Sequence, residues 1–262
     1  MTIKYRKHQR YLFQQNADTM VEPNKILLAF DFDHTIVDGN SDTWITGCLP
    51  DPLPVTLKQD YIKGQWTNYM RKVLAYLNDS GVTVGKLKAR LKEMQLVEGM
   101  AELLCWLASE HDRFDVILVS DSNSLFIDWI LQRVDLQHVF GHIFTNPATV
   151  DACGHVLLKP HHSHSCSRCP VNLCKGQVLR EYVASQPCCF SSIVYVGDGA
   201  NDLCPVLSLS CKDAVLPRKG YSLMRWIKEL LSEDSTNVLP HIVPWDTGFE
   251  ILQFLQRITG TT

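Results

Sequence analysis

Acidic and hydroxyl side chains follow three short apolar runs that are far apart in the chain. Asp31 and Asp33 follow the run that begins at Ile26, and their alternate spacing places both carboxylates on one side of a strand. Two carboxylates this close repel each other unless a cation or a proton lies between them. Ser120 and Asp198 follow the two later runs. Together these oxygen-bearing side chains are suited to binding Mg²⁺ and a phosphate group.

The third of these segments carries a second pair of acids. Asp198 and Asp202 follow Gly197, and a glycine at such a turn lets the backbone approach a ligand closely. A phosphate group also needs a positive charge beside it. Lys175, which directly precedes a helical pattern, is the best candidate for that charge, and Lys159 is its rival.

The elements that must position these residues form an alternating pattern. Strands are predicted at residues 26–30, 114–119 and 193–196, with weaker candidates at 139–144 and 214–216. Apolar residues at helical spacing predict helices around residues 103–107, 126–134, 178–183 and 223–230. This alternation predicts an α/β fold with a Rossmann-like parallel sheet and helices on both faces. Ligands bind such sheets at the carboxyl ends of the strands, where the polar residues lie.

A long stretch after the first strand lacks any apolar strand. Its clearest pattern is helical, over Tyr61 to Leu77, and it predicts a small helical cap inserted after the first strand. The predicted organisation is a polar tail at residues 1–24, a core at 25–43 and 96–262, and a helical cap at 44–95.

Composition excludes several classes of protein. The 262 residues include 25 Lys and Arg against 28 Asp and Glu, and a net charge of −3 disfavours a nonspecific nucleic-acid binder. No apolar run approaches the roughly 20 residues that span a bilayer, so no transmembrane segment is expected. The amino-terminal residues lack the apolar stretch of an export signal. We therefore expect a cytoplasmic protein whose 10 cysteines are mostly reduced.

The three polar segments together resemble a known family. Residues 30–35, 119–120 and 197–202 are similar to the motifs of the haloacid dehalogenase-like phosphatases. The resemblance is closer to the branch of phosphoethanolamine/phosphocholine phosphatases and pyridoxal phosphate phosphatases. The segments that carry this closer resemblance are residues 38–42, 120–123, 162–170, 172–175, 204–205 and 217–221.

The resemblance implies a Mg²⁺-dependent phosphatase. Asp31 would attack phosphorus and form an aspartyl-phosphate, and Asp33 would protonate the leaving group and then activate water. The resemblance assigns Mg²⁺ binding to Asp31, to Asp198 and to the backbone carbonyl of Asp33. Asp202 would assist through water or by orienting Lys175. Ser120 and Lys175 would bind the phosphate oxygens.

Two further acids are candidates for binding the rest of the substrate. In the family, the acids that match Asp42 and Asp121 contact the leaving group, and carboxylates there favour a cationic amine or a protonated pyridine. Asp42 could instead cap the first helix of the cap, and Asp121 could stabilise a turn. Residues 42–45 and 123–129 resemble the pyridoxal phosphate branch more closely. Pyridoxal 5′-phosphate is therefore the leading expected substrate, and phosphoethanolamine or phosphocholine is the alternative.

A loop rich in cysteine and histidine has three interpretations. Cys166, Cys169 and Cys174 could bind zinc if His162 or His164 completed a tetrahedral site. The same cysteines could form a disulfide, or the loop could be reduced and purely structural.

Two other classes of function fit part of the pattern. A phosphotransferase or mutase on the same fold would pass the phosphoryl group to an acceptor instead of water. A noncatalytic metal-binding protein would use the cysteine loop, but it would have no chemical need for both Asp31 and Asp33.

Overall fold

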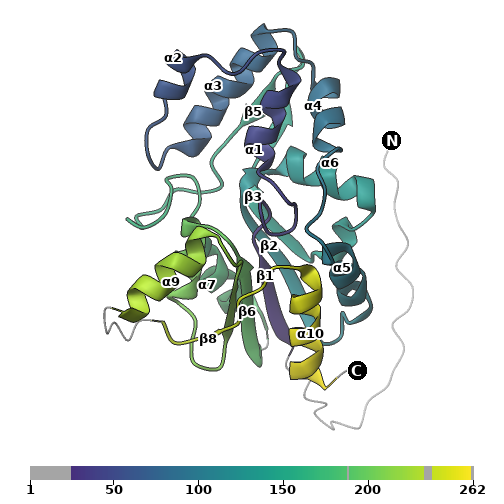
Figure 1. Ribbon diagram of the computed structural model, residues 1–262, viewed down its shortest axis with the longest axis vertical. Helices are drawn as coiled ribbons and strands as arrows, with labels where there is room; N and C mark the ends of the chain where they lie inside the picture. The colour runs from purple at the N-terminus through teal and green to yellow at the C-terminus, as the bar shows by residue number, and fades with distance from the viewer. Residues whose placement is uncertain (1–24, 188, 233–237, 261–262) are drawn as a thin grey trace, which may run out of the picture.

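The computed structural model describes residues 25–187, 189–232 and 238–260; the predicted tail at 1–24 lies outside these ranges. A six-stranded parallel sheet forms the centre of the molecule, in the order β3-β2-β1-β6-β7-β8 (Figure 1). Its strands are β1 (Ile26–Phe30), β2 (Phe114–Asn123), β3 (His142–Asn146), β6 (Ser192–Gly197), β7 (Ala214–Pro217) and β8 (His241–Ile242). The predicted parallel α/β fold is confirmed.

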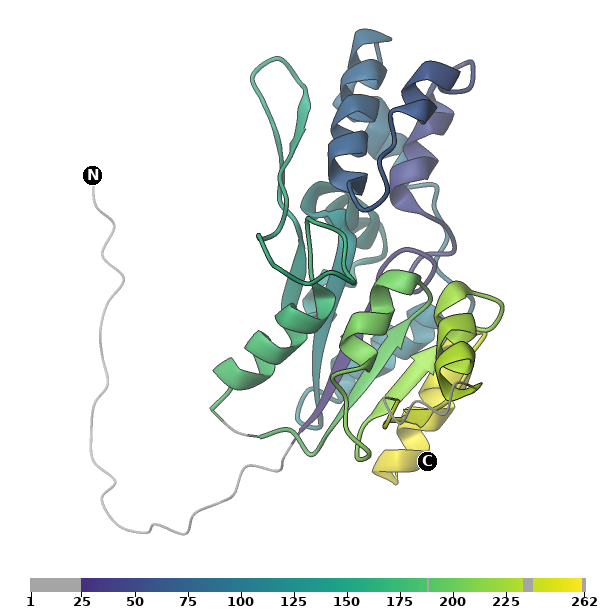
Figure 2. The same cartoon turned by 90° about the vertical axis from the view of Figure 1, so that its left-hand side faces the viewer.

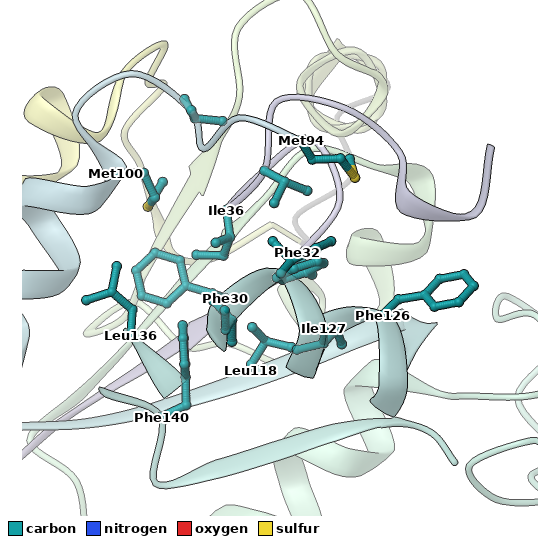
Figure 3. Close-up of a cluster of buried hydrophobic side chains, with 14 of the residues drawn as sticks. Phe30, Phe32, Ile36, Met94, Met100, Leu118, Phe126, Ile127, Leu136 and Phe140 are labelled. Atoms are coloured by element: carbon teal, nitrogen blue, oxygen red, sulfur yellow. The ribbon is translucent and has the colours of Figure 1, made fainter. Parts of the chain in front are cut away.

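Side chains of β1 alternate between two hydrophobic cores, one on each face of the sheet. Leu28 and Phe30 belong to the larger core (Figure 3), and Leu27 and Ala29 belong to the smaller one. Helices α5 (Met100–Ser109), α6 (Ser124–Val134) and α10 (Gly248–Thr259) contribute to the larger core. Helices α7 (Lys175–Ser185), α8 (Leu203–Val206) and α9 (Ser222–Ser232) contribute to the smaller one. Helices therefore cover both faces, as the sequence predicts.

The stretch after β1 is helical in the structure. It contains α1 (Ser41–Trp44), the 3₁₀ helix η1 (Ile45–Cys48), α2 (Val55–Gln59), α3 (Trp66–Asp79) and α4 (Val84–Leu91). These helices form a group beyond the carboxyl ends of the strands (Figure 2). Helix α3 begins at Trp66 rather than at Tyr61, because the chain turns at Gly64, whose φ is 82°.

Some short elements differ from the expectation. The weak strand predicted at 139–144 corresponds to β3, which begins later, at His142, and ends at Asn146; the 3₁₀ helix η2 (Gln137–Val139) precedes it. A hairpin of β4 (Ala148–Val150) and β5 (Val156–Leu158) lies beside α3, where Arg71 Nε donates to the Leu158 carbonyl at 2.7 Å. A further 3₁₀ helix, η3 (Ala200–Asp202), follows β6. No helix of the described ranges has the length and apolar character needed to cross a membrane.

The start of α10 provides a test of the packing. Gly248 N–H donates to the Glu98 carbonyl at 2.7 Å, and a Cβ at this position would overlap the backbone of Gly99. We expect Gly248→Ala to lower the free energy of unfolding by about 1–3 kcal/mol, because neither backbone segment can move easily. Urea denaturation followed by circular dichroism measures this change.

Gly85 in α4 supplies the matched control. A Cβ there would have only Thr83 Oγ1 nearby, at 3.8 Å. Gly85→Ala should raise the free energy of unfolding by up to about 1 kcal/mol, because alanine favours helix more than glycine does. Equal effects of the two substitutions would contradict the packing described for α10.

Candidate active site

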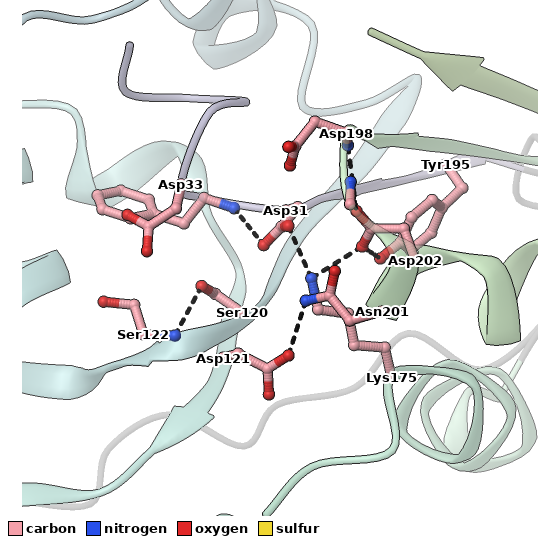
Figure 4. Close-up of polar contacts among 12 residues, drawn as sticks. Asp31, Asp33, Ser120, Asp121, Ser122, Lys175, Tyr195, Asp198, Asn201 and Asp202 are labelled. Carbon is pink, nitrogen blue, oxygen red and sulfur yellow. Dashed lines mark hydrogen bonds and ion pairs between the residues drawn. The ribbon is translucent and has the colours of Figure 1, made fainter. Parts of the chain in front are cut away.

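A buried lysine lies between two carboxylates at the carboxyl ends of β1 and β6 (Figure 4). Lys175 Nζ is 2.8 Å from Asp31 Oδ2 and 2.8 Å from Asp202 Oδ1, and the lysine side chain is 1% exposed. Burial alone would lower the pKa of Lys175, but the Asp202 and Asp31 carboxylates outweigh it and raise that pKa above its ordinary value. The ammonium therefore stays charged. The rival Lys159 is exposed beside the β4-β5 hairpin and lies outside this cluster.

Asp202 holds this arrangement together with both carboxylate oxygens. Oδ1 accepts a second hydrogen bond from the Tyr195 hydroxyl at 2.7 Å. Oδ2 accepts the backbone N–H groups of Asp198 at 3.1 Å and Gly199 at 2.8 Å. Gly197 is required for this approach, since a Cβ there would lie 2.6 Å from the Asp202 carboxyl carbon. Asp202 thus orients both the lysine and the loop that carries Asp198.

The acidic cluster has an excess of negative charge that suits a divalent cation. Carboxylate oxygens of Asp31, Asp198 and Asp202 all lie within 4.8 Å of one another. Among the described residues, no group donates a hydrogen bond to the Asp198 carboxylate. Burial raises the pKa of Asp198 to about 7, and burial with the nearby Asp202 raises that of Asp31 well above its usual value. One lysine cannot balance three carboxylates, so the residues present fit a bound Mg²⁺.

Asp33 is held by three hydrogen bonds next to this cluster. Its Oδ1 accepts the Ser41 N–H at 2.8 Å, and its Oδ2 accepts the Ser41 hydroxyl at 3.1 Å and the Asn40 amide at 3.3 Å. Burial raises the pKa of Asp33 to about 6, although the hydrogen bonds from Ser41 oppose the rise. A carboxyl group with this pKa can both give and take a proton near neutral pH.

Two of the predicted site residues, Ser120 and Asp121, lie at the end of β2 close to Asp31 and Asp33. Ser120 is buried, and its hydroxyl accepts the Ser122 N–H at 3.1 Å. Asp121 accepts from the side-chain amides of Asn172 at 2.8 Å and Asn201 at 2.7 Å, so it connects the strand end to the loop before α7 and to η3. This arrangement gives Asp121 a clear structural role in addition to its place in the pocket.

Asp42 has an unusual environment. The residue is 3% exposed, and its Oδ2 accepts from Trp66 Nε1 at 2.6 Å, while its buried Oδ1 has no hydrogen-bond partner among the described residues. Burial raises the pKa of Asp42 to about 8. The cap of α1 is Asn40, whose side chain accepts from Thr43 N–H at 2.9 Å. The capping role considered for Asp42 is therefore wrong.

Two adjoining cavities meet at Asp42 and Trp66. The first, of about 140 Å³, is lined in part by Asp31, Asp33, Ser120, Asp121 and Asp198. The second, of about 200 Å³, lies among the helices after β1 and is lined in part by Tyr61, Tyr69, Met70 and Val73. An anionic group with bound cation fits the first cavity, and an apolar or aromatic group fits the second.

Sequence reasoning missed several residues that hold the acids in position. Tyr195 lies within an apolar run and looked like an ordinary core residue. Arg218 donates to the His34 carbonyl at 2.7 Å and to Asp38 at 2.8 Å, and so braces the turn after β1. Its place in a matching segment, residues 217–221, was the only available signal. The hydrogen bonds of Arg218 join residues that are far apart in the sequence, so the sequence does not reveal them.

Comparisons with known proteins identify the family of the chain. The family described as "Putative Phosphatase" matches residues 26–259. Pyridoxal phosphate phosphatase PHOSPHO2 of Mus musculus is 47% identical over 236 residues, which cover 88% of this chain and 98% of the relative. The phosphoethanolamine/phosphocholine phosphatase of Homo sapiens is 39% identical over 238 residues, which cover 89% of each chain.

Solved structures support the fold. A phospho-aspartyl intermediate analogue of phosphoserine phosphatase superposes with a TM-score of 0.56 at 19% identity, over 88% of this chain and 99% of that one. The family match and the identities of 47% and 39% show membership of a family, which a shared fold alone would not show. The chain therefore belongs to the Putative Phosphatase family and is a phosphomonoester hydrolase with the haloacid dehalogenase-like fold.

Proposed function

We propose that the protein hydrolyses a small phosphomonoester in two steps, with an aspartyl-phosphate on Asp31 as intermediate. The observation that supports this most is the position of Asp31, which Lys175 holds at 2.8 Å beside a small acidic cavity. A carboxylate oriented in this way can act as a nucleophile once the negative charge around it is balanced.

The neighbouring side chains supply the proton transfers. An Asp31 oxygen forms a bond to phosphorus while the ester P–O bond breaks, and Asp33 gives its proton to the leaving oxygen. Asp33 then takes a proton from water, which attacks the aspartyl-phosphate and releases inorganic phosphate and free Asp31. Lys175 and Ser120 hold phosphate oxygens as charge develops on them.

The acidic cluster supports Mg²⁺ as the cofactor. Asp31, the backbone carbonyl of Asp33 and Asp198 would hold the ion, and Asp202 would orient these groups through the hydrogen bonds described above. When bound, the ion shields the anionic nucleophile from the anionic phosphate.

The cavity beside Asp42 favours pyridoxal 5′-phosphate as substrate. The rings of Tyr61, Trp66 and Tyr69 contact one another, with centroids 5.4 to 5.7 Å apart, at the second cavity. An aromatic cavity of this kind suits a flat pyridine ring. Asp42 Oδ1, which has no hydrogen-bond partner among the described residues, can accept a hydrogen bond from a protonated ring nitrogen, and the positive charge of that ring would favour the ionised carboxylate. The PHOSPHO2 relatives are named as pyridoxal phosphate phosphatases.

Phosphoethanolamine or phosphocholine is the second candidate. A carboxylate such as Asp42 also suits an ammonium group, and relatives 38–39% identical are named for these substrates. Aromatic rings can also contact a quaternary ammonium group. The two candidates therefore differ in the size and shape of the group that occupies the second cavity.

The helices between residues 44 and 95 act, in this proposal, as a cap that limits substrate size and excludes water during phosphoryl transfer. We also propose a reducing, cytoplasmic location. It is supported by the cysteines that the structure describes, all of which are free.

Phosphate release with different substrates tests the proposal directly. With Mg²⁺ present, we expect pyridoxal 5′-phosphate to be hydrolysed with a higher kcat/KM than phosphoethanolamine or phosphocholine. EDTA should reduce release to background, because the acidic cluster then keeps its excess negative charge, and added Mg²⁺ should restore it. Preference for either amine substrate would select the second candidate. Hydrolysis of none of the three by folded, Mg²⁺-loaded protein would contradict both.

Two substitutions separate the roles of the first acids. Asp31→Asn should lower kcat by at least about a thousandfold and leave no phosphorylated protein, because the nucleophile is gone. Asp33→Asn should still become phosphorylated by p-nitrophenyl phosphate, whose leaving group needs no proton, but should lose turnover because water is no longer activated. Rapid quench with intact-protein mass spectrometry detects the phosphoenzyme. Its absence from Asp33→Asn, despite a burst of nitrophenol, would contradict the assignment.

Asp42→Asn tests recognition of the leaving group. The amide can still accept from Trp66, but it loses the charge offered to a cationic ring. We expect kcat/KM for pyridoxal 5′-phosphate to fall about 10- to 100-fold, the value of a hydrogen bond to a charged group. Hydrolysis of p-nitrophenyl phosphate should change far less. Asp60→Asn, which alters an exposed carboxylate paired with Lys72, is the control and should change neither rate. An equal fall in kcat/KM for both substrates would show that Asp42 supports the structure of the site and does not recognise the leaving group.

A further inference from the structure

Four cysteine sulfurs lie close together at the amino-terminal end of α7. Sγ atoms of Cys166, Cys169, Cys174 and Cys204 all lie within 4.8 Å of one another. Cys166 and Cys169 lie in the loop before α7, Cys174 caps that helix, and Cys204 comes from α8. The first three were candidates from the sequence. Only the fold brings in Cys204, which is 30 residues beyond Cys174 in the chain.

The separations of these sulfurs match a tetrahedral metal site. The Sγ–Sγ distances are 3.8 Å for Cys166 and Cys204, 3.5 Å for Cys169 and Cys174, and 3.8 Å for Cys174 and Cys204. Tetrahedral zinc binds thiolates at about 2.3 Å, which places the sulfurs about 3.8 Å apart. A cluster of this spacing needs little movement to close around one ion.

The histidines of the loop have other partners. His164 Nε2 lies 2.7 Å from the Pro170 carbonyl, and its Nδ1 accepts the Cys166 N–H at 3.2 Å. His162 Nε2 accepts the Cys174 N–H at 3.0 Å. Cys204 therefore lies in the cluster where the sequence suggests His162 or His164 as the fourth member. The two histidines fix the backbone that carries Cys166 and Cys174.

The start of α7 places partial positive charge beside Cys174. Cys174 lies at the amino-terminal end of the 11-residue helix α7, where the helix dipole stabilises negative charge, and its sulfur accepts the Gln177 N–H at 3.4 Å. Gly176 allows Cys204 to approach, because a Cβ at residue 176 would lie 2.8 Å from the Cys204 sulfur. Helix α7 and Cys204 can therefore meet only with glycine at this position.

We propose that Cys166, Cys169, Cys174 and Cys204 bind one structural Zn²⁺ ion through four thiolates. All four positions around the ion are filled by protein, which is the arrangement of structural rather than catalytic zinc sites. The site is separate from the carboxylate cluster of the active site, although it shares the two segments that carry Lys175 and Asp202.

A disulfide explains the cluster less well. A disulfide joins two sulfurs at about 2.05 Å and leaves the others unpaired. Here Cys174 has two sulfur neighbours at similar distances, and Cys204 likewise has two. A single ion at the centre explains the convergence of all four groups.

The zinc site would fix the catalytic lysine. Cys174 directly precedes Lys175, and Cys204 lies two residues after Asp202, so the ion would join the two chain segments whose side chains pair at 2.8 Å. Loss of zinc should therefore lower kcat for phosphate release as well as the melting temperature, even though no cysteine contacts the reacting atoms.

Metal analysis of the full-length protein tests the proposal without any activity assay. Protein expressed with added Zn²⁺ and purified under reducing conditions should contain about one Zn²⁺ per chain after dialysis against excess Mg²⁺. Replacement by Co²⁺ should give the intense thiolate-to-cobalt charge-transfer absorption of a sulfur-ligated tetrahedral site, which an ion held by the carboxylates would lack. The unsubstituted protein suffices for these measurements, so they remain decisive if a variant fails to fold.

Variants locate the ion. Cys169→Ser and Cys204→Ser should lower zinc content to below about one tenth and abolish the charge-transfer band, because each removes one ligand. Cys105→Ser, which changes an exposed cysteine of α5, should retain both. Folded, reduced protein without zinc, zinc retained by both ligand variants, or a Cys169–Cys174 disulfide in protein alkylated on cell lysis would overturn the proposal. None of these outcomes depends on whether the phosphatase mechanism proposed above is correct.

Discussion

The active site depends on one buried ammonium group. Parallel strands β1 and β6 are neighbours and bring Asp31, Asp198 and Asp202 to the same edge of the sheet, where three carboxylates repel one another. Lys175 lies against two of them from the start of α7. An unpaired charge buried this deeply would cost several kcal/mol, so the strand order and the position of the helix are linked through this contact.

The sequence predicts the chemical groups better than their arrangement. Apolar runs that end in polar residues mark buried parallel strands, and that pattern alone locates Asp31, Ser120 and Asp198 at one edge of the sheet. It cannot show which side chains pair across that edge. Tyr195 has the sequence context of a core residue, yet its hydroxyl donates to Asp202. The role of such a residue depends on its hydrogen-bond partner, which is known only once the folded structure places the two side chains together.

Short elements were missed for a related reason. Strand β8 has two residues, and the β4-β5 hairpin has three in each strand, so none of them is long enough to show a hydrophobic period. Their positions follow from the neighbours they pair with. Asp42 shows the same limit at the scale of one residue: its place at the start of a helix suggested a capping role, but Asn40 already fills that role.

The two side-chain clusters around α7 separate hard from soft ligands. Carboxylate oxygens suit Mg²⁺, and thiolates suit Zn²⁺, so each ion is bound more favourably by its own cluster. In the mechanism proposed above, the ion pair between Asp31 and Lys175 changes when Asp31 carries the phosphoryl group. A zinc ion bound through Cys174 and Cys204 does not take part in that change of charge. Together with the Lys175–Asp202 contact, it would hold the start of α7 in one position through both chemical steps.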